Sequence, residues 1–330
     1  MKIAILGAGA WGTALAIGLC PRHRVSLWVR DPDHCREMES SRINRRHLDP
    51  FPIPDSILLS NDLNAAISDA ELVVIAVPMS GLREMFRTVA ASGRKIPLIW
   101  VSKGFESGTS KLPHQVAMEE YDEIAPFGAL SGPSFAREVA EGLPVALTLA
   151  SHDHDFAKRT AAALHNHRIR IYSSEDLVGV EIGGAVKNVM AIASGISDGL
   201  GLGANARAAL ITRGLAEITR LGLKLGGRLE TFLGLSGVGD LTLTCTGDLS
   251  RNRAVGMLLA GGKPLDLILA ELGSTAEGVY TAREVERLAQ SLDVDMPITK
   301  AVCSVLYEGV PASCAVEELM KRDPKAESAL

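Results

Sequence analysis

Short apolar runs alternate with helix-like stretches through the first half of the chain. Residues 3–6 form the first run, and residues 13–19 have the composition of an apolar helix. Runs typical of buried strands follow at 24–30, 71–78, 97–101, in a short stretch ending at 130, at 143–150 and at 168–172, with helical stretches at 81–91 and 111–121. This alternation predicts an α/β fold built on a doubly wound parallel sheet. Residues 42–56 are polar and rich in proline, which predicts a surface loop.

A different pattern begins near residue 176, where helical periodicity takes over and strand-like runs vanish. Long candidate helices cover 180–196 and 205–221, and shorter ones follow at 251–260, 263–272, 277–291 and 298–308, with breaks at Pro297 and Pro311. A length of 330 residues also favours two domains over one. We therefore predict a sheet domain over residues 1–175 and an all-helical domain over residues 176–330.

Three glycines separate the first strand from the first helix. Gly7, Gly9 and Gly12 have the spacing G-x-G-x-x-G, which is the dinucleotide-binding fingerprint when it joins a strand to a helix. Gly7 allows the tight turn, Gly9 lets backbone approach a pyrophosphate, and Gly12 lets helix and strand pack closely. This predicts a Rossmann-type domain, the alternative being a glycine-rich turn in another α/β protein. Trp11 either covers the cofactor or packs into the sheet.

Arg30 ends the second predicted strand, where this fold selects its cofactor. An acidic residue there binds the ribose 2′-hydroxyl of NAD, whereas an arginine accepts the 2′-phosphate of NADP. Arg30 therefore favours NADP(H) over NAD(H), although Asp31 directly follows it. A solvated charge at a strand end is the alternative interpretation.

Composition argues against several classes of protein. Aromatic residues make up only 4% of the chain and the net charge is −5, so we expect no nucleic-acid partner. The five cysteines are odd in number and lack C-x-x-C spacing, and the histidines lack ligand spacing, so we expect neither disulfides nor a metal site. These features favour the cytoplasm.

The first twenty residues also resemble a signal peptide or a short membrane span. Lys2 precedes an uncharged run that continues to Cys20. Glycines interrupt this run at turn positions, and a second strand follows it, so export is the less favoured interpretation. We expect no later segment to be long and apolar enough to span a membrane, and no stable membrane insertion.

A solitary charge within an apolar helix is the first candidate for chemistry. Lys187 is the only charged residue between Ile182 and Ser197. Burial or a second cation, for which Lys103 is a candidate, lowers the pKa of such a lysine and lets it exchange protons near neutral pH. The alternatives are a Lys187 that reaches water from a domain boundary and a Lys103 that is solvated in its loop.

Two further polar segments lie in the helical half. Asp240 follows a glycine-rich stretch, where it either caps a helix or orients a lysine or a substrate hydroxyl. Residues 250–253, Ser-Arg-Asn-Arg, gather donors at a predicted helix start, which suits a phosphate group. An exposed helix start with two solvated arginines is the alternative. In the sheet domain, Lys103, Gly132 and Ser134 follow strands and are expected at the ligand-binding edge.

These segments together resemble the bacterial NAD(P)-dependent glycerol-3-phosphate dehydrogenases from end to end. The matching stretches are residues 7–14, 102–104, 131–138, 184–189, 239–246, 250–253 and 277–278. Each is modest alone, but their joint order and spacing are specific to the family. The resemblance implies a Rossmann domain, a helical domain for substrate binding and dimerisation, and a homodimer. It also implies reversible reduction of dihydroxyacetone phosphate to sn-glycerol 3-phosphate for phospholipid synthesis.

The resemblance also assigns residues. It makes Lys187 the proton donor or acceptor, and we expect Asp240 to orient the Lys187 ammonium. Expected substrate contacts are Lys103, Gly132, Ser134, Lys187, Asp240, Ser250, Arg251 and Asn252. Expected dinucleotide contacts, besides the three glycines, are Ala10, Trp11, Arg30, Lys103, Ala136, Arg251 and Glu277. The family often has serine at the position of Ala10, so a hydroxyl contact is lost there while the backbone amide remains.

Three other functions stay open at this point. A dehydrogenase with the same domain plan could act on a hydroxy acid, which residues 250–253 argue against. A dinucleotide sensor would need the glycine fingerprint but no buried lysine. A secreted or membrane-anchored protein would use residues 1–20 as its leader.

Overall fold

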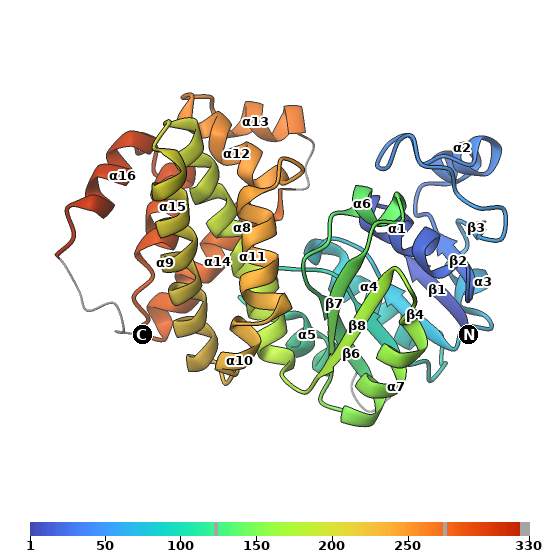
Figure 1. Ribbon diagram of the computed structural model, residues 1–330. Helices are drawn as coiled ribbons and strands as arrows, with labels where there is room; N and C mark the ends of the chain where they lie inside the picture. Colours follow the sequence, from blue (N-terminus) through green and yellow to red (C-terminus); the bar gives the residue numbers. More distant parts are fainter. Residues whose placement is uncertain (122–124, 273–275, 324–330) are drawn as a thin grey trace. The chain divides into compact units, whose positions relative to one another are not determined.

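The computed structural model describes residues 1–121, 125–272 and 276–323. These residues form two compact units (Figure 1). The first contains Met1–Ser102 and Pro113–Leu177, and the second contains Lys103–Leu112 and the chain from Val178 onward. A single boundary near residue 176 would have placed Lys103–Leu112 in the sheet domain. These residues belong to the second unit because Phe105 and Leu112 are buried in its apolar core.

The first unit is built on an eight-stranded sheet with the order β3-β2-β1-β4-β5-β6-β7-β8. Its strands are β1 Lys2–Leu6, β2 Arg24–Trp28, β3 Leu58–Ser60, β4 Leu72–Ile75, β5 Leu98–Trp100, β6 Phe127–Ser131, β7 Val145–Ala150 and β8 Ile169–Ser174. The strands from β3 to β6 are parallel. The central strands β4 and β5 are buried along their whole length, as expected when helices cover both faces of a sheet. The predicted Rossmann-type fold class is confirmed.

One strand departs from the predicted parallel arrangement, because β7 runs antiparallel to β6. The connection between them contains one five-residue helix, α6 (Ala136–Ala140). Five helical residues span only about 7.5 Å, whereas a five-residue strand spans about 16 Å. This helix is too short to run back along the strand, and the chain re-enters the sheet from the same edge, so that β7 is antiparallel to β6. The eleven-residue helix α7 (His154–Leu164) is long enough for the crossover, and β8 is parallel to β7.

Helices pack against both faces of this sheet. The first unit has the helices α1 Ala10–Leu19, α2 Pro32–Ser41, α3 Leu63–Ile67, α4 Met79–Ala91 and α5 Pro113–Glu120, besides α6 and α7. Neighbouring residues of β5 point to opposite faces, since Ile99 joins the core cluster that contains Leu15 of α1. Trp100 instead meets Phe86 of α4, with ring centroids 5.6 Å apart.

The proline-rich segment between α2 and β3 is a loop, but it is not confined to the surface. Leu48, Ile53 and Ile57 are buried in the core of the first unit, and Asn44 is 0% exposed. The expectation of a surface loop was therefore wrong for its inward-facing side chains. Apolar residues spaced along this polar segment reach the core, while their neighbours stay in solvent.

Among the described residues of the second unit, every regular element is a helix. Its elements are α8 Leu177–Gly199, α9 Gly203–Lys224, α10 Leu229–Phe232, the π-helical turn η1 Leu235–Gly239, α11 Asp240–Thr246, α12 Arg251–Ala260, α13 Leu265–Leu272, α14 Glu277–Ser291, α15 Pro297–Tyr307 and α16 Ala312–Met320. Side chains from most of these helices share one core with α8. Pro297, predicted as a break before the helix at 298–308, is the first residue of α15, a position that proline favours.

Helix α8 corrects one expectation about membranes. Its 23 residues, with a mean hydropathy of 1.3 in the most apolar window, are long and apolar enough to cross a bilayer. The expectation that no segment after residue 20 qualifies was therefore wrong. In the structure 94% of that window is buried inside the protein. A helix that is apolar on all sides is also what the centre of a helical core requires.

Candidate active site

The turn between β1 and α1 leaves no room for a side chain at two of its glycines, Gly7 and Gly12. Gly7 has φ +124°, and a Cβ on it would lie 2.4 Å from the carbonyl oxygen of Ala76. A Cβ on Gly12 would lie 2.0 Å from the carbonyl oxygen of Gly7. At Gly9 an added Cβ would meet nothing within 4 Å, so the backbone there is open to a ligand. The first amides of α1 lack intrahelical partners, so the turn fits a pyrophosphate.

The other predicted cofactor residues of the first unit lie in α1, at the start of α6 and just beyond β2. Ala10, Trp11 and Ala136 are partly buried and pack against the apolar core. Helix α6, which begins at Ala136, packs against α1. Trp11 thus packs against the core, which is one of its two predicted roles. Arg30 lies two residues beyond β2 and is exposed.

Gly132 and Ser134 follow β6 at the carboxyl edge of the parallel strands. Gly132 has φ +137°, and a Cβ on it would lie 3.1 Å from the carbonyl oxygen of Ala146. The Ser134 hydroxyl donates to the carbonyl oxygen of Gly132 at 3.0 Å. Ligands of doubly wound sheets bind at this edge, and the glycine turn and Arg30 also follow strands there.

Three charged side chains meet inside the second unit. The Lys187 ammonium donates to Oδ1 of Asp240, and the Lys103 ammonium donates to Oδ2 of the same carboxylate at 2.7 Å. Asp240 is 0% exposed and Lys187 is 6% exposed. Lys187 also donates to the Thr244 hydroxyl at 3.0 Å. These residues form the lysine–aspartate cluster, in which one carboxylate binds two ammonium groups. Lys187 is therefore not a surface lysine, and Lys103 is paired.

Close packing of glycines brings this cluster together. A Cβ on Gly183 of α8 would lie 2.2 Å from the carbonyl oxygen of Ser236 in η1. Lys187 follows Gly183 by four residues, about one helical turn, and so lies on the same face of α8. Asp240 is the first residue of α11, directly after η1. The helix cap of α11 is Gly239 rather than Asp240, whose carboxylate instead binds the two lysines.

The electrostatics of the cluster favour proton exchange at Lys187. Burial lowers the pKa of its ammonium to about 7, and the charge of Lys103 acts in the same direction. Asp240 opposes both effects by stabilising the ammonium. An amine with a pKa near neutrality can donate a proton to an oxygen and take it back at physiological pH.

The start of α12 forms a second polar group. The Ser250 hydroxyl accepts from the backbone N–H of Arg253 at 3.3 Å and caps the helix. The amide of Asn252 donates to Oδ1 of Asn188 at 3.0 Å, and its oxygen accepts from the backbone N–H of Gly278 at 3.0 Å. Asn188 follows Lys187 directly, and Gly278 follows Glu277. These contacts hold the start of α12 against α8, which contains Lys187, and against α14.

The two arginines at this helix start differ in their surroundings. Arg253 binds Asp198 at 2.8 Å and Asp248 at 3.0 Å, and its side chain is only 13% exposed. Arg251 is exposed and interacts electrostatically with Glu277. Arg253 is thus held by structural ion pairs, which makes Arg251 the better candidate for a substrate group.

Sequence reasoning missed three residues that support these groups. Thr244 and Asn188 lie within the motifs that carried the family resemblance, and their position beside Asp240 and Lys187 is the signal that could have identified them. Glu284 of α14 gave no such signal. Its carboxylate, 4% exposed, accepts from the backbone N–H of Gly108 at 3.0 Å and from the Ser110 hydroxyl at 2.7 Å. It holds the segment that begins with Lys103.

The donors gathered here suit an organic cofactor and an anionic substrate. Within the described ranges, the structure has no group of three or more His, Cys, Asp or Glu side chains arranged for a metal ion. A glycine turn suited to a dinucleotide on a Rossmann sheet, in one chain with a helical unit that contains a buried lysine of lowered pKa, defines a class. That class is the two-domain nicotinamide-dependent dehydrogenases.

Comparison with known proteins identifies the family. Models of the N-terminal and C-terminal parts of NAD-dependent glycerol-3-phosphate dehydrogenase match residues 2–157 and 176–317. The chain therefore belongs to the NAD-dependent glycerol-3-phosphate dehydrogenase family, which confirms the resemblance drawn from its motifs.

Individual relatives match along nearly the whole chain. Glycerol-3-phosphate dehydrogenase (NAD(P)+) of Nitrosospira multiformis is 64% identical over 331 residues, 99% of each chain. The crystal structure of glycerol-3-phosphate dehydrogenase from Coxiella burnetii is 42% identical with a TM-score of 0.93, covering 97% of this chain and 99% of that one. The enzyme of Saccharomyces cerevisiae is 29% identical with a TM-score of 0.83, covering 98% and 99%.

Proposed function

We propose that this protein catalyses the reversible NAD(P)H-dependent reduction of dihydroxyacetone phosphate to sn-glycerol 3-phosphate. The product would supply glycerophospholipid synthesis. Membership of the family supports the reaction. The observation that carries the mechanism is the lysine–aspartate cluster, because a buried amine with a pKa of about 7 is the group that a carbonyl reduction needs.

In this mechanism Lys187 is the general acid. Its ammonium would donate a proton to the C2 oxygen of dihydroxyacetone phosphate. A reduced nicotinamide, when bound, would supply the hydride that C2 accepts. Asp240 orients the ammonium through the bond to Oδ1. Lys103 adds positive charge that stabilises the developing alkoxide. In the reverse direction the neutral Lys187 amine takes the hydroxyl proton.

The start of α12 is the proposed site for the substrate phosphate. Arg251 offers a planar guanidinium, and the capped helix start adds a favourable dipole. An asparagine amide has two N–H donors, and Asn252 directs one of them to Asn188. The other would bind the phosphate, together with the hydroxyl of Ser250. Gly132 and Ser134 are further proposed substrate contacts.

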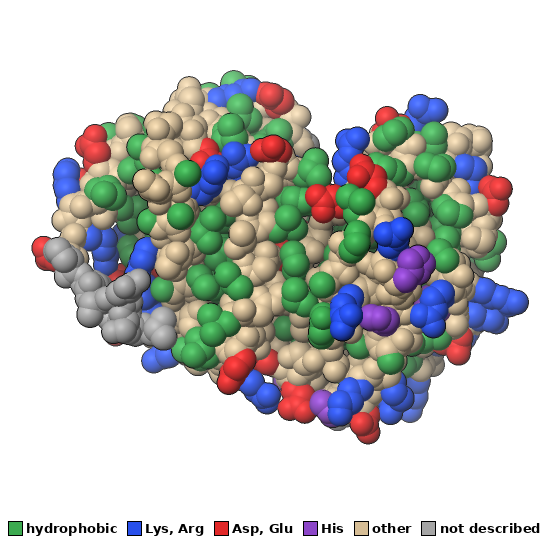
Figure 2. Space-filling view, in the orientation of Figure 1, with side chains coloured by type: hydrophobic (Ala, Val, Ile, Leu, Met, Phe, Trp, Pro, Cys, Tyr) green, Lys and Arg blue, Asp and Glu red, His purple; other side chains and the backbone are tan. Residues whose placement is uncertain are grey.

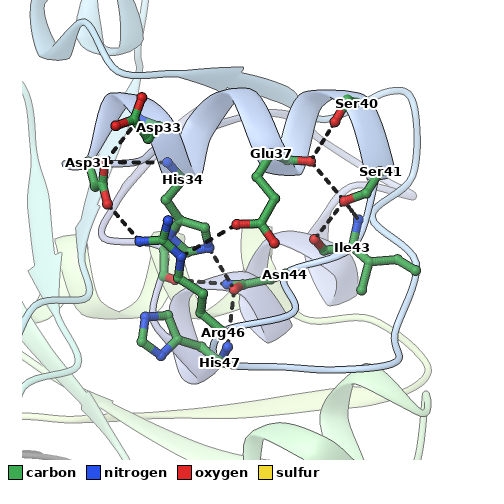
Figure 3. Close-up of polar contacts among 11 residues, drawn as sticks. Asp31, Asp33, His34, Glu37, Ser40, Ser41, Ile43, Asn44, Arg46 and His47 are labelled. Atoms are coloured by element: carbon green, nitrogen blue, oxygen red, sulfur yellow. Dashed lines mark hydrogen bonds and ion pairs between the residues drawn. The ribbon is translucent and has the colours of Figure 1, made fainter.

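The proposed dinucleotide site consists of the glycine turn with Ala10, Trp11 and Ala136, and of Arg30, Lys103, Arg251 and Glu277. The surroundings of Asp31 support a preference for NADP(H). One carboxylate oxygen of Asp31 accepts from the backbone N–H groups of Asp33 and His34, and the other binds Arg46 at 2.6 Å (Figure 3). Both oxygens are engaged, which disfavours Asp31 as the ribose ligand that NAD requires and leaves Arg30 to meet a 2′-phosphate.

We further propose a homodimer that works in the cytoplasm without stable membrane insertion. Large apolar side chains are exposed on the helical unit, among them Leu223, Leu229 and Leu233 at 41%, 42% and 60%. Over α9 and α11, Figure 2 shows mainly hydrophobic side chains and uncharged atoms. Exposed apolar patches of this kind mark protein contacts. Sedimentation of the purified protein at twice the chain mass of 35.0 kDa would support the dimer.

The reaction is tested by following NADPH and NADH oxidation with dihydroxyacetone phosphate and with a panel of other ketones. The proposal expects turnover of dihydroxyacetone phosphate, much slower turnover of unphosphorylated keto acids, and a higher kcat/KM with NADPH. Preference for a keto acid would instead indicate a hydroxy-acid dehydrogenase. Cofactor binding without turnover on any ketone would indicate a sensor.

A further inference from the structure

A buried asparagine forms hydrogen bonds with two residues of the glycine turn and the helix that follows it. Asn44 lies in the proline-rich loop and is 0% exposed. Its amide nitrogen donates to the carbonyl oxygen of Ala8 at 2.9 Å and to the Thr13 hydroxyl at 2.8 Å. Ala8 lies between Gly7 and Gly9, and Thr13 follows Gly12. One side chain therefore binds the turn on both sides of the backbone that would face the pyrophosphate.

The oxygen of the same amide is held by the other side of the loop. It accepts from the backbone N–H of His47 at 3.2 Å and lies 3.1 Å from Nε2 of His34 (Figure 3). The Ala8 carbonyl can only accept, so the nitrogen of Asn44 must face it and the oxygen must face His34. His34, which is 4% exposed, then carries a hydrogen on Nε2. Both N–H donors and both lone pairs of the amide are used.

This arrangement addresses a weakness of the turn. Glycine has wide backbone freedom, so a turn that needs glycines loses more conformational entropy when it is ordered than other turns do. A Cβ at Gly9 would meet nothing within 4 Å, so no packing against neighbours fixes the backbone there, and Gly7 adopts a positive φ. The shape of the turn must therefore be imposed by groups outside it, and Asn44 supplies two such bonds.

We propose that Asn44 is a positioning residue for the dinucleotide: it fixes the glycine turn in its binding shape without touching the cofactor. The inference rests on the proposed cofactor site. The pyrophosphate is common to both cofactors. Loss of the hydrogen bonds from Asn44 therefore weakens the binding of NADPH and of NADH by a similar factor. Replacement of a residue that binds the 2′-phosphate would instead weaken the binding of NADPH alone.

Two variants remove the contact with little change of shape. Asn44→Asp keeps the volume but replaces the N–H donors by an oxygen facing the Ala8 carbonyl. Thr13→Val keeps the shape of Thr13 and removes the acceptor. The control is Arg42→Ala, because Arg42 ties the same loop to the carbonyls of Ile53 and Ile57 at 3.2 and 3.0 Å, away from the turn.

Dissociation constants for NADPH and NADH are measured by calorimetry without substrate, alongside the Tm of each variant, so the result does not depend on which ketone is reduced. Asn44→Asp is expected to raise both constants about tenfold, the usual worth of a buried hydrogen bond, and Thr13→Val to raise them less. Arg42→Ala is expected to lower the Tm while both constants stay within about twofold, a change well below one buried hydrogen bond.

The proposal is overturned if Asn44→Asp and Thr13→Val lower the Tm but leave both constants within about twofold of the wild type, less than one hydrogen bond would account for. It is equally overturned if Arg42→Ala weakens the binding of both cofactors as much as Asn44→Asp and Thr13→Val do. The effect would then come from a general loosening of the loop. Should Asn44→Asp fail to fold, Thr13→Val decides the question by the same criteria.

Discussion

Two of the buried carboxylates in the helical unit, Asp240 and Glu217, differ in what they bind. Asp240 is 0% exposed and binds the ammonium groups of Lys187 and Lys103. Glu217 of α9 is 1% exposed and accepts from the backbone N–H groups of Ile298 and Thr299 at 2.6 and 3.1 Å, at the start of α15. One carboxylate holds charged side chains that can move a proton, and the other holds a helix in place.

The comparison shows that burial and a shifted pKa do not by themselves identify a catalytic group. Burial raises the pKa of Glu217 to about 7, and burial lowers the pKa of Lys187 to about 7. Both groups thus titrate near neutrality. Only Lys187 belongs to a cluster with a second cation, close to a helix start suited to phosphate. The residues that a buried group binds, rather than its pKa, distinguish a candidate catalytic group from a structural one.

The largest expected effect comes from removing the amine. Lys187→Ala should lower kcat by at least ~100-fold, the usual worth of a positioned acid or base, while cofactor binding changes little. Steady-state kinetics with dihydroxyacetone phosphate and calorimetry with NADPH measure the two quantities. Turnover close to that of the wild type would exclude Lys187 from the proton transfer.

Replacing each carboxylate by its amide tests the comparison directly. Asp240→Asn should lower kcat by roughly 10- to 100-fold, because the ammonium of Lys187 loses its orienting charge, and should also destabilise the protein by about 3–5 kcal/mol. Glu217→Gln should leave kcat within about twofold, since Glu217 takes no part in acid–base catalysis. Equal losses of kcat in the two variants would show that both carboxylates act only through the fold.

A smaller effect is expected at the proposed phosphate site. Arg251→Ala should raise the KM for dihydroxyacetone phosphate about tenfold or more, because a charge-assisted hydrogen bond is lost, with a smaller change in kcat. Initial rates over a range of substrate concentrations separate the two constants. An unchanged KM would place the phosphate elsewhere.

The smallest effect concerns stability alone. The folded pKa of Glu217 lies above its ordinary value, so the folded state binds more protons than the unfolded state between about pH 4.5 and 7. Stability from this group is greatest at acid pH and is lost as pH rises through about 7. The Tm of the wild type relative to Glu217→Gln should therefore fall by a few degrees, on the order of 2–4 °C per kcal/mol, across that window. A difference that does not vary with pH would contradict the raised pKa.

Much of this structure could be predicted because its signals are local. The glycine spacing and the alternation of strands and helices identify the Rossmann fold, and a solitary lysine in an apolar helix identifies Lys187. The antiparallel β7 depends on the length of a connection, which a strand pattern does not encode. The structural roles of Asn44, Glu217 and Glu284 could not be predicted from the sequence, because each forms hydrogen bonds with a segment far away in the sequence. Their partners become visible only when the chain is folded.

The pH dependence of kcat/KM in both directions tests the central claim most directly. If Lys187 is the acid for reduction and the base for oxidation, kcat/KM for dihydroxyacetone phosphate falls as pH rises through about 7, the pKa of its ammonium, and kcat/KM for glycerol 3-phosphate rises through the same range. Profiles that shift together in one direction, or that persist unchanged in the residual activity of Lys187→Ala, would contradict the account.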